Sequence, residues 1–311
     1  VDLNPTAVEL ARVSIWIHTF VPGLPLSMLD HHLVQGNSLV GIGTLDEAQE
    51  VVAAAAPGLF EYFFVDNIVR SAAQSMAKVG NLADTDSAEI QAARGALQEA
   101  HLSIDPLGAM FDILAASRLD TAIAGQIISN ISDWQDKPEE IRASNLHRSA
   151  IEVMTGIEPF HFPVAFPDVF ARKRAGFDVM LGNPPWQEAT IEEDDFWTRA
   201  WPGLQGLPQG QQETVKEKLR KDRPDLVSKY QNELADNVLL RKVLLAGDFP
   251  GMGKGDPDFY KAFIWRFWKL VSDQSGYLGF VVPRVAWSAK GGYEFRKQVF
   301  ETGHVIDITV L

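Results

Sequence analysis

Residues 177–186 read FDVMLGNPPW, and the predicted fold of the chain is built around this stretch. Its apolar first half predicts a fully buried strand of a parallel sheet over residues 177–181. Proline has no backbone N–H and a fixed φ, so Pro184 and Pro185 should end the strand in a stiff, extended elbow. We expect this elbow at the carboxyl end of the strand, where open α/β sheets bind their ligands.

The elbow offers uncharged hydrogen-bond acceptors beside an aromatic ring. The side-chain oxygen of Asn183 and the carbonyl oxygen of Pro184 can together hold both hydrogens of an exocyclic amine. The ring of Trp186 can stack on the base that carries this amine. The alternative is a strand-ending turn with an anchoring Trp, but its position after an apolar strand favours the binding role.

This motif resembles the catalytic NPPW motif of S-adenosylmethionine-dependent DNA methyltransferases that methylate amino groups. It is most similar to that of the adenine-N6 enzymes of the Eco57I-like and type IIG restriction-modification group. The resemblance covers residues 1–44 and 159–311, including the aromatic-proline approach at residues 166–170, and it is weak in between. It implies an α/β fold, a Rossmann-like class I methyltransferase sheet that is incomplete here and carries a helical insertion.

The resemblance also implies a mechanism at the elbow. Asn183, Pro184, Pro185 and Trp186 match the catalytic motif. An adenine flipped out of double-stranded DNA would have its amine held by Asn183 and the carbonyl of Pro184. Trp186 would stack on the base. No metal is implied.

Three further residues match positions that hold the cofactor S-adenosylmethionine in the family. Asp2, near the end of a short strand pattern, would bind the ribose hydroxyls. Asn37 stands where the family often has Asp, and its amide oxygen can still accept a hydrogen bond from the cofactor's adenine amine. Phe263 would pack against the same adenine ring.

Composition limits the cellular setting and the partners. The 311 residues include no Cys, and no apolar run reaches membrane-spanning length, so we expect a reducing compartment, the cytoplasm, and no membrane contact. The net charge of −13 argues against a wide phosphate-binding face. The acidity is local, with 10 acidic and 3 basic residues over positions 45–110. We expect DNA to be bound through a recognition domain outside this chain, and the acidic segment to be available to a protein partner.

The patterns divide the chain into three parts. Residues 1–44 form the first part of the methyltransferase core, residues 45–158 the helical insertion, and residues 159–311 the catalytic part of the core. Periodicity and caps predict helices over residues 4–18, 46–56, 59–78, 86–102, 106–131, 138–154, 211–221, 226–246, 258–272 and 293–301. In the first of them, Val8, Ala11 and Ile15 should face the core, and Trp16 is a further candidate for this face. Further buried strands are expected over residues 276–282 and 304–311.

Several alternatives stay open at the level of sequence. We expect the chain to be a fragment that lacks the glycine-rich cofactor loop and the target-recognition domain of its family. A protein-glutamine or RNA N-methyltransferase can use the same elbow, and a non-catalytic scaffold can retain the fold. The basic cluster at residues 172–174 fits a phosphate contact as well as a solvated turn.

Overall fold

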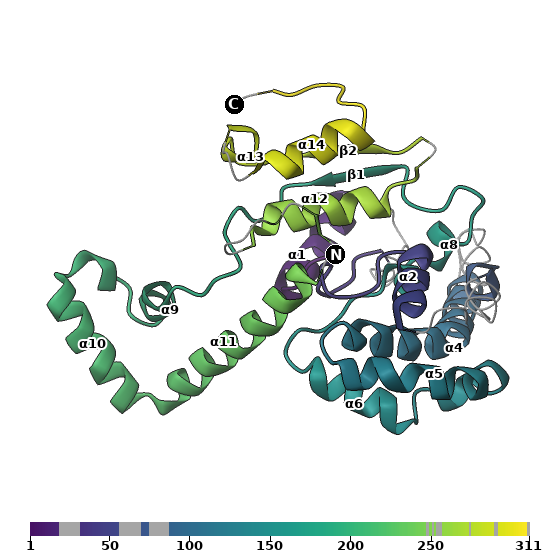
Figure 1. Ribbon diagram of the computed structural model, residues 1–311, viewed down its shortest axis with the longest axis horizontal. Coiled ribbons are helices and arrows are strands. Elements are labelled where there is room, and N and C mark those ends of the chain that lie inside the picture. The colour runs from purple at the N-terminus through teal and green to yellow at the C-terminus, as the bar shows by residue number, and fades with distance from the viewer. Residues whose placement is uncertain are drawn as a thin grey trace. The chain divides into compact units, whose positions relative to one another are not determined.

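The structure is a computed structural model that describes residues 1–18, 32–55, 70–74, 87–246, 249–250, 252, 257–273, 275–288 and 292–309. Most of these residues are helical and the strands form a small parallel sheet, so the fold is mixed α/β (Figure 1). The elements in chain order are α1 (Pro5–His18), α2 (Leu45–Ala55), α4 (Ser87–Ser117), α5 (Thr121–Asp136), η3 (Pro138–Glu140), α6 (Asn145–Val153), α7 (Phe162–Ala165), α8 (Pro167–Phe170), β1 (Val179–Gly182), α9 (Glu193–Ala200), η4 (Leu204–Gly206), α10 (Gln209–Asp222), α11 (Pro224–Leu245), α12 (Phe259–Leu270), β2 (Tyr277–Phe280), α13 (Val285–Ser288) and α14 (Tyr293–Thr302).

The chain divides into two compact units. The first comprises Val1–Asn183 and Phe263–Val281, and the second comprises Pro184–Ala262 and Val282–Leu311. The boundary therefore falls at the peptide bond after Asn183. The three-part division of the sequence at residues 44 and 158 stays a prediction.

The sheet of the first unit pairs β1 with β2 in parallel, as the sequence predicts. Val179 lies opposite Tyr277, and Leu181 opposite Gly279. The prediction of buried strands is wrong for both, because Val179 is 53% and Leu181 76% exposed on β1, and Tyr277 on β2 is 60% exposed. Alternate side chains of a strand point to opposite faces, and Met180 points to the face that packs on a buried hydrophobic cluster. That cluster consists of Phe160, Phe162, Phe170 and Leu270.

A second parallel arrangement lies at the start of the chain. Asp2 forms a bridge with Gln35, in which the N–H of Asp2 donates to the carbonyl of Val34 (3.3 Å) and that of Gly36 donates to the carbonyl of Asp2 (3.0 Å). Asn37 forms the next bridge, with Pro159. The first bridge lies at the short strand pattern that the sequence shows around Asp2, whereas no strand was predicted at Asn37 or Pro159.

Helix α1 begins as predicted, but it buries less of its apolar face. The side-chain oxygen of Asn4 accepts hydrogen bonds from the N–H groups of Thr6 (2.9 Å) and Ala7 (3.4 Å), which caps the helix. Val8 is buried, whereas Ile15 is 40% exposed, so the expectation that Ile15 lies in the core is wrong. Ile15 lies two turns beyond Val8 on the same face of α1.

Residues 87–153, which fall in the predicted insertion, form helices whose breaks differ from those that the sequence predicts. Helix α4 continues through Pro106, where the sequence predicts a break. Because Pro106 has no N–H, the carbonyl of Leu102 cannot form its usual helical hydrogen bond. Leu102 is 70% exposed, so water can bond to this carbonyl instead. Beyond the proline, α4 buries Leu107 and Phe111 completely, and this packing outweighs the local cost.

Side-chain caps set the remaining boundaries of the insertion. The predicted helix over residues 106–131 is wrong, because the chain leaves α4 at Ser117 and enters α5 at Thr121. A carboxylate oxygen of Asp120 accepts from the N–H of Ala122 (2.7 Å) and caps α5. The predicted helix over residues 138–154 is shorter, since Ser144 caps α6 by accepting from the N–H of His147 (3.1 Å). Most of the predicted helix over residues 59–78 lies outside the described residues.

The carboxylate of Asp112 links helices α4 and α6 to His161, in the segment that precedes β1. Asp112 on α4 binds Nε2 of His147 (3.0 Å) on α6 and Nε2 of His161 (3.1 Å). Nδ1 of His161 accepts from the N–H of Ile42 (3.0 Å), so its Nε2 carries the proton and donates to Asp112. Burial alone would raise the pKa of Asp112, but the hydrogen bonds from the two histidines outweigh it and lower the pKa to about 2.

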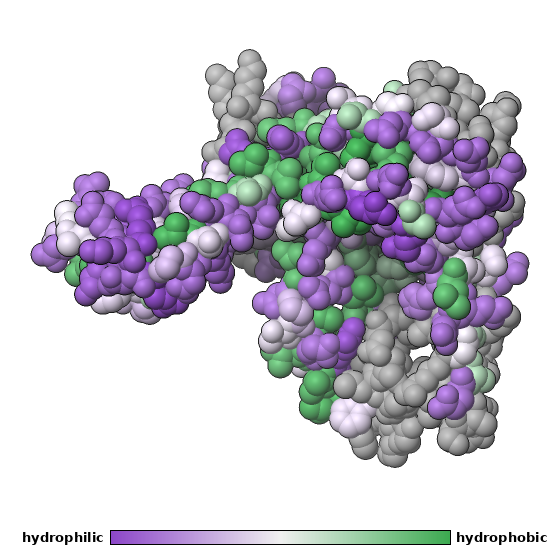
Figure 2. Space-filling view, turned by 90° about the horizontal axis from the view of Figure 1, so that it is seen from below, coloured by the Kyte–Doolittle hydropathy of each residue, from purple (hydrophilic) through white to green (hydrophobic). Residues whose placement is uncertain are grey.

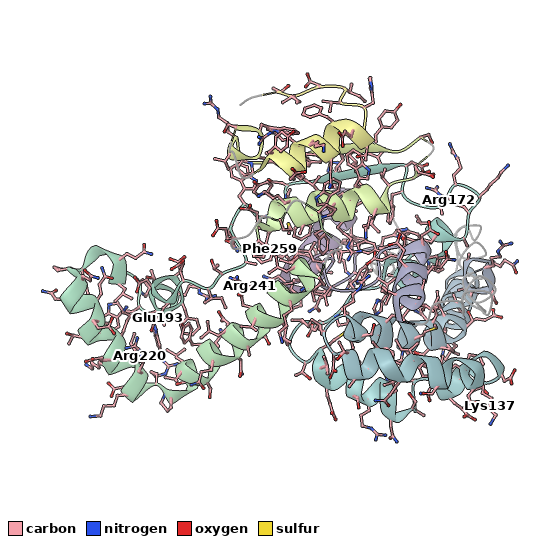
Figure 3. The ribbon with its side chains drawn as sticks, in the orientation of Figure 1. Lys137, Arg172, Glu193, Arg220, Arg241 and Phe259 are labelled. Atoms are coloured by element: carbon pink, nitrogen blue, oxygen red, sulfur yellow. The ribbon has the colours of Figure 1, made fainter. Side chains whose placement is uncertain are left out.

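The second unit has its own small core. Phe196, Trp197 and Leu204 are buried against residues of α10 and α11. Glu193 on α9 accepts from the indole N–H of Trp197 (2.9 Å) and pairs with Arg220 on α10, toward which it points in Figure 3. The outer surface of α9 and α10, at the left of Figure 2, is largely hydrophilic.

The last residues do not form the predicted third strand. Helix α14 matches its prediction, but residues 304–309 have no regular structure, and Ile306 is 74% exposed. An apolar run becomes a strand only when another strand pairs with it, and none among the described residues does so. Within the same residues, no helix is both long and apolar enough to span a bilayer.

Candidate functional site

Asn183 directly follows β1, as the sequence predicts. The strand's last carbonyl, on Gly182, accepts from the N–H of Val281 (3.1 Å), so pairing with β2 continues to the residue before Asn183. The Asn183 side chain is exposed, and it makes no hydrogen bond to any other described residue. An amide free at the end of a strand is available to an external group.

The residues after Asn183 begin the second unit. Pro184 is buried, whereas Pro185 is exposed and Trp186 is 51% exposed. The chain then pairs with the segment that enters α12: the N–H of Ala189 donates to the carbonyl of Pro257 (2.8 Å). The N–H of Phe259, labelled in Figure 3, donates to the carbonyl of Gln187 (3.1 Å). The elbow is therefore anchored on its downstream side by backbone hydrogen bonds.

The structure brings Asp2 and Asn37 to neighbouring segment ends. Asp2 is exposed, and its Oδ1 accepts a hydrogen bond from the N–H of Asn4 (2.7 Å). Its Oδ2 does not take part in this hydrogen bond. The half-buried Asn37 side chain accepts from the N–H of Leu39 (3.1 Å) and so orders its own turn. A carbonyl oxygen has two lone pairs, so Asn37 can still accept from a ligand.

Helix α12 contacts the last residue of β1. A Cβ placed on Gly182 would lie 2.4 Å from Cε2 of Phe267, so only glycine permits this approach. Phe267 in turn packs on the half-buried ring of Phe263, with ring centroids 6.0 Å apart. The ring of Phe267 therefore lies between Phe263 and the end of β1 and contacts both.

Helices α2 and α12 are joined by a buried ion pair that the sequence did not predict. Glu47 on α2 and Arg266 on α12 are 2% and 1% exposed, and their side chains are 2.7 Å apart. Arg118 binds the other carboxylate oxygen of Glu47 at 2.8 Å. Burial by itself would raise the pKa of Glu47, but the charges of Arg266 and Arg118 outweigh it and lower the pKa to about 2.

Glu47 had a detectable signal in the sequence, and Arg266 had none. Thr44 and Glu47 fit the capping-box spacing: the N–H of Glu47 donates to the Thr44 hydroxyl (3.0 Å), and Glu47 accepts from the N–H of Gly43 (2.9 Å). Arg266 lies 219 residues further along the chain, so no local pattern relates it to Glu47.

In the basic cluster at residues 172–174, both arginines bind other residues of the chain. Arg172 pairs with Asp178 (3.0 Å) and donates to the carbonyl of Gly176, and Arg174 donates to the hydroxyl of Ser275 (2.9 Å). Lys173 is exposed and has no ion pair among the described residues. The same residues contain no cluster of three or more acidic or His side chains arranged to bind a metal ion.

Comparison with known proteins gives one match. The family model described as Eco57I restriction-modification methylase matches residues 1–224. This range includes every site residue predicted above except Phe263, and it also covers residues 45–158, where the sequence motifs alone show only a weak resemblance. No curated protein and no solved structure matches the chain.

Proposed function

This chain belongs to the Eco57I restriction-modification methylase family, and from that premise we propose that it transfers a methyl group from S-adenosylmethionine to N6 of a flipped adenine in DNA. Family membership supports DNA methylation in general. The choice of adenine rests on residues 183–186, which offer two uncharged acceptors for an exocyclic amine and an aromatic ring for stacking.

The observation that carries the proposal is the exposed Asn183 amide without a partner among the described residues. An Asn side chain can bond to backbone groups close to it in the chain, as that of Asn37 does, and the Asn183 side chain makes no such bond among the described residues. In our proposal the Asn183 oxygen and the carbonyl of Pro184 accept the two amine hydrogens of adenine. By fixing both N–H bonds, the two acceptors favour a tetrahedral nitrogen whose lone pair is no longer conjugated with the ring. That lone pair would form the new bond to the methyl carbon as the bond from this carbon to sulfur breaks, the neutral thioether would leave, and the nitrogen would then lose one proton to solvent. Trp186 stacks on the base and holds it outside the duplex.

The cofactor residues are chemically suited to S-adenosylmethionine. The second carboxylate oxygen of Asp2 can accept from a ribose hydroxyl, Asn37 retains a lone pair for an adenine amine, and the half-buried Phe263 offers a ring face. When bound, S-adenosylmethionine supplies an activated methyl group on its sulfonium. The protein's task is to bind and orient the two partners, because the leaving group needs no further activation.

The test is replacement of Asn183 by Ala in the intact protein. We expect loss of labelled methyl transfer to DNA, with an unchanged circular dichroism spectrum and unchanged affinity for S-adenosylmethionine. Asn232→Ala is the control, since Asn232 is an exposed Asn on α11. Turnover at the wild-type rate in Asn183→Ala would disprove the role of the amide. Methylation of cytosine N4 instead of adenine N6 in the wild-type protein would disprove the choice of base.

A further inference from the structure

Arg266 holds a loop to helix α12 through backbone carbonyls. Its Nη2 donates to the carbonyl oxygens of Leu39 (3.2 Å) and Gly41 (3.1 Å). Its Nη1 donates to Glu47, which also accepts from the N–H of Gly43. One buried ion pair therefore binds three backbone groups of the loop over residues 39–43.

Close packing restricts this loop further. A Cβ on Gly43 would lie 2.2 Å from Nη1 of Arg266 and 2.7 Å from the Glu47 carboxylate. A Cβ on Gly41 would lie 1.9 Å from the carbonyl oxygen of Phe160. Both glycines permit approaches that no side chain allows, so the loop has one tightly defined position.

The loop is a direct continuation of the Asn37 turn. The Asn37 oxygen accepts from the N–H of Leu39, and the carbonyl of Leu39 accepts from Arg266. On α12, Arg266 follows Phe263 by three residues, and residues with this spacing are neighbours on a helix surface. Arg266 thus connects Asn37 to the part of α12 that presents Phe263.

We infer that Arg266 is a positioning residue for the adenine ring of the cofactor. It holds Asn37 and Phe263 in a fixed relation without touching the cofactor. Arginine suits this role because its planar guanidinium donates in several fixed directions, whereas a Lys ammonium is a single point charge. The inference rests on the proposed function, in which Asn37 and Phe263 contact that ring.

The main variant is Arg266→Lys, and its matched control is Arg118→Lys. Both replace a guanidinium that binds Glu47, and both retain the positive charge. Calorimetry with S-adenosylmethionine should give a dissociation constant roughly tenfold higher for Arg266→Lys, because its hydrogen bonds to the loop are lost. The KM for S-adenosylmethionine should rise while kcat stays within about twofold. Arg118→Lys should change neither constant.

Hydrogen–deuterium exchange of the free protein supplies a readout that does not depend on the cofactor. Amides of residues 38–43 should exchange faster in Arg266→Lys than in the wild type, and at the wild-type rate in Arg118→Lys. If Arg266→Lys does not fold, Gly43→Ala replaces it in the calorimetry and in the hydrogen–deuterium exchange, with the same expected changes. It displaces the Arg266 guanidinium without removing any charge.

The outcomes separate this inference from the proposed function. A wild-type protein that does not bind S-adenosylmethionine would disprove the proposed function. Wild-type binding with unchanged affinity and exchange in a folded Arg266→Lys would overturn the inference. Equal weakening by both Lys variants would also overturn it, because loss of stability alone would then explain the effect.

Discussion

Replacing Gly182 with Ala tests whether the end of β1 must lie at one fixed distance from α12. The new Cβ would meet Phe267 at 2.4 Å (Cε2) and 2.6 Å (Cζ), whereas ordinary contacts begin at 3.4 Å. The ring or the strand end must therefore move by about 1 Å. Forcing a methyl group into a packed site of this kind costs about 1–3 kcal/mol of stability.

The functional cost should exceed the cost in stability. Asn183 follows Gly182 directly, so a shift of the strand end moves the amide that we propose to grip adenine. A misplacement of about 1 Å at a reacting group typically costs about 10²-fold in rate. We therefore expect Gly182→Ala to remain folded by circular dichroism and to lose about two decades of kcat in methyl transfer.

Two further variants make this test decisive. Adding Phe267→Leu removes Cε2 and Cζ, so the double variant should recover part of the lost rate, with a coupling energy that a double-mutant cycle measures. Gly125→Ala in α5 is the control: nothing lies within 4 Å of its Cβ position, so it should stabilise the protein by about 0.5–1 kcal/mol and leave kcat unchanged. Wild-type kcat in Gly182→Ala, or no recovery in the double variant, would show that the distance between the end of β1 and α12 does not control the rate.

Three other perturbations address the cofactor, the insertion and the DNA. Asp2→Ala should weaken S-adenosylmethionine binding by about one to two decades, measured by calorimetry, since a charged acceptor contributes roughly 1.5–3 kcal/mol; unchanged affinity would place the ribose elsewhere. The Asp112 carboxyl has its folded-state pKa lowered to about 2, so it stabilises the fold at neutral pH by an amount on the order of 2 kcal/mol. Urea unfolding should show Asp112→Asn to be less stable at pH 7, with the difference shrinking as the pH falls below about 4; a difference independent of pH would contradict this. Lys173→Glu should weaken DNA binding and reduce its salt dependence by about one unit of slope in gel shifts. Lys137→Glu, on the insertion (Figure 3), should do neither, and the reverse result would place the DNA on the acidic helices.

Local signals predicted the elements that depend on local causes. Asn4 caps α1 because an amide oxygen can bond N–H groups two and three residues on, a cause contained within a few residues. The end of β1 at Gly182 follows equally from the two prolines that come after Asn183. The FDVMLG run predicted a parallel strand, and its pairing with β2 confirms this.

Errors arose where distant parts of the chain decide the outcome. Pro106 should break a helix on local grounds, yet the burial of Leu107 and Phe111 keeps α4 continuous. Residues 304–309 have the composition of a strand, but the described residues offer them no partner. Burial of β1 was overestimated because an apolar run does not indicate which face of the sheet another element covers.

Helix α12 links the proposed methyl-acceptor and cofactor sites through adjacent side chains. Phe267 contacts the residue before Asn183, Phe263 packs on Phe267, and Arg266 holds the loop that follows Asn37. The partner of Arg266, Glu47, belongs to the first helix of the acidic insertion, and Arg118 at the end of α4 binds the same carboxylate. A change in the insertion therefore has a direct route to the loop. This gives residues 45–118 a physical role in the fold, because Glu47 supplies the negative charge that the buried guanidinium of Arg266 requires.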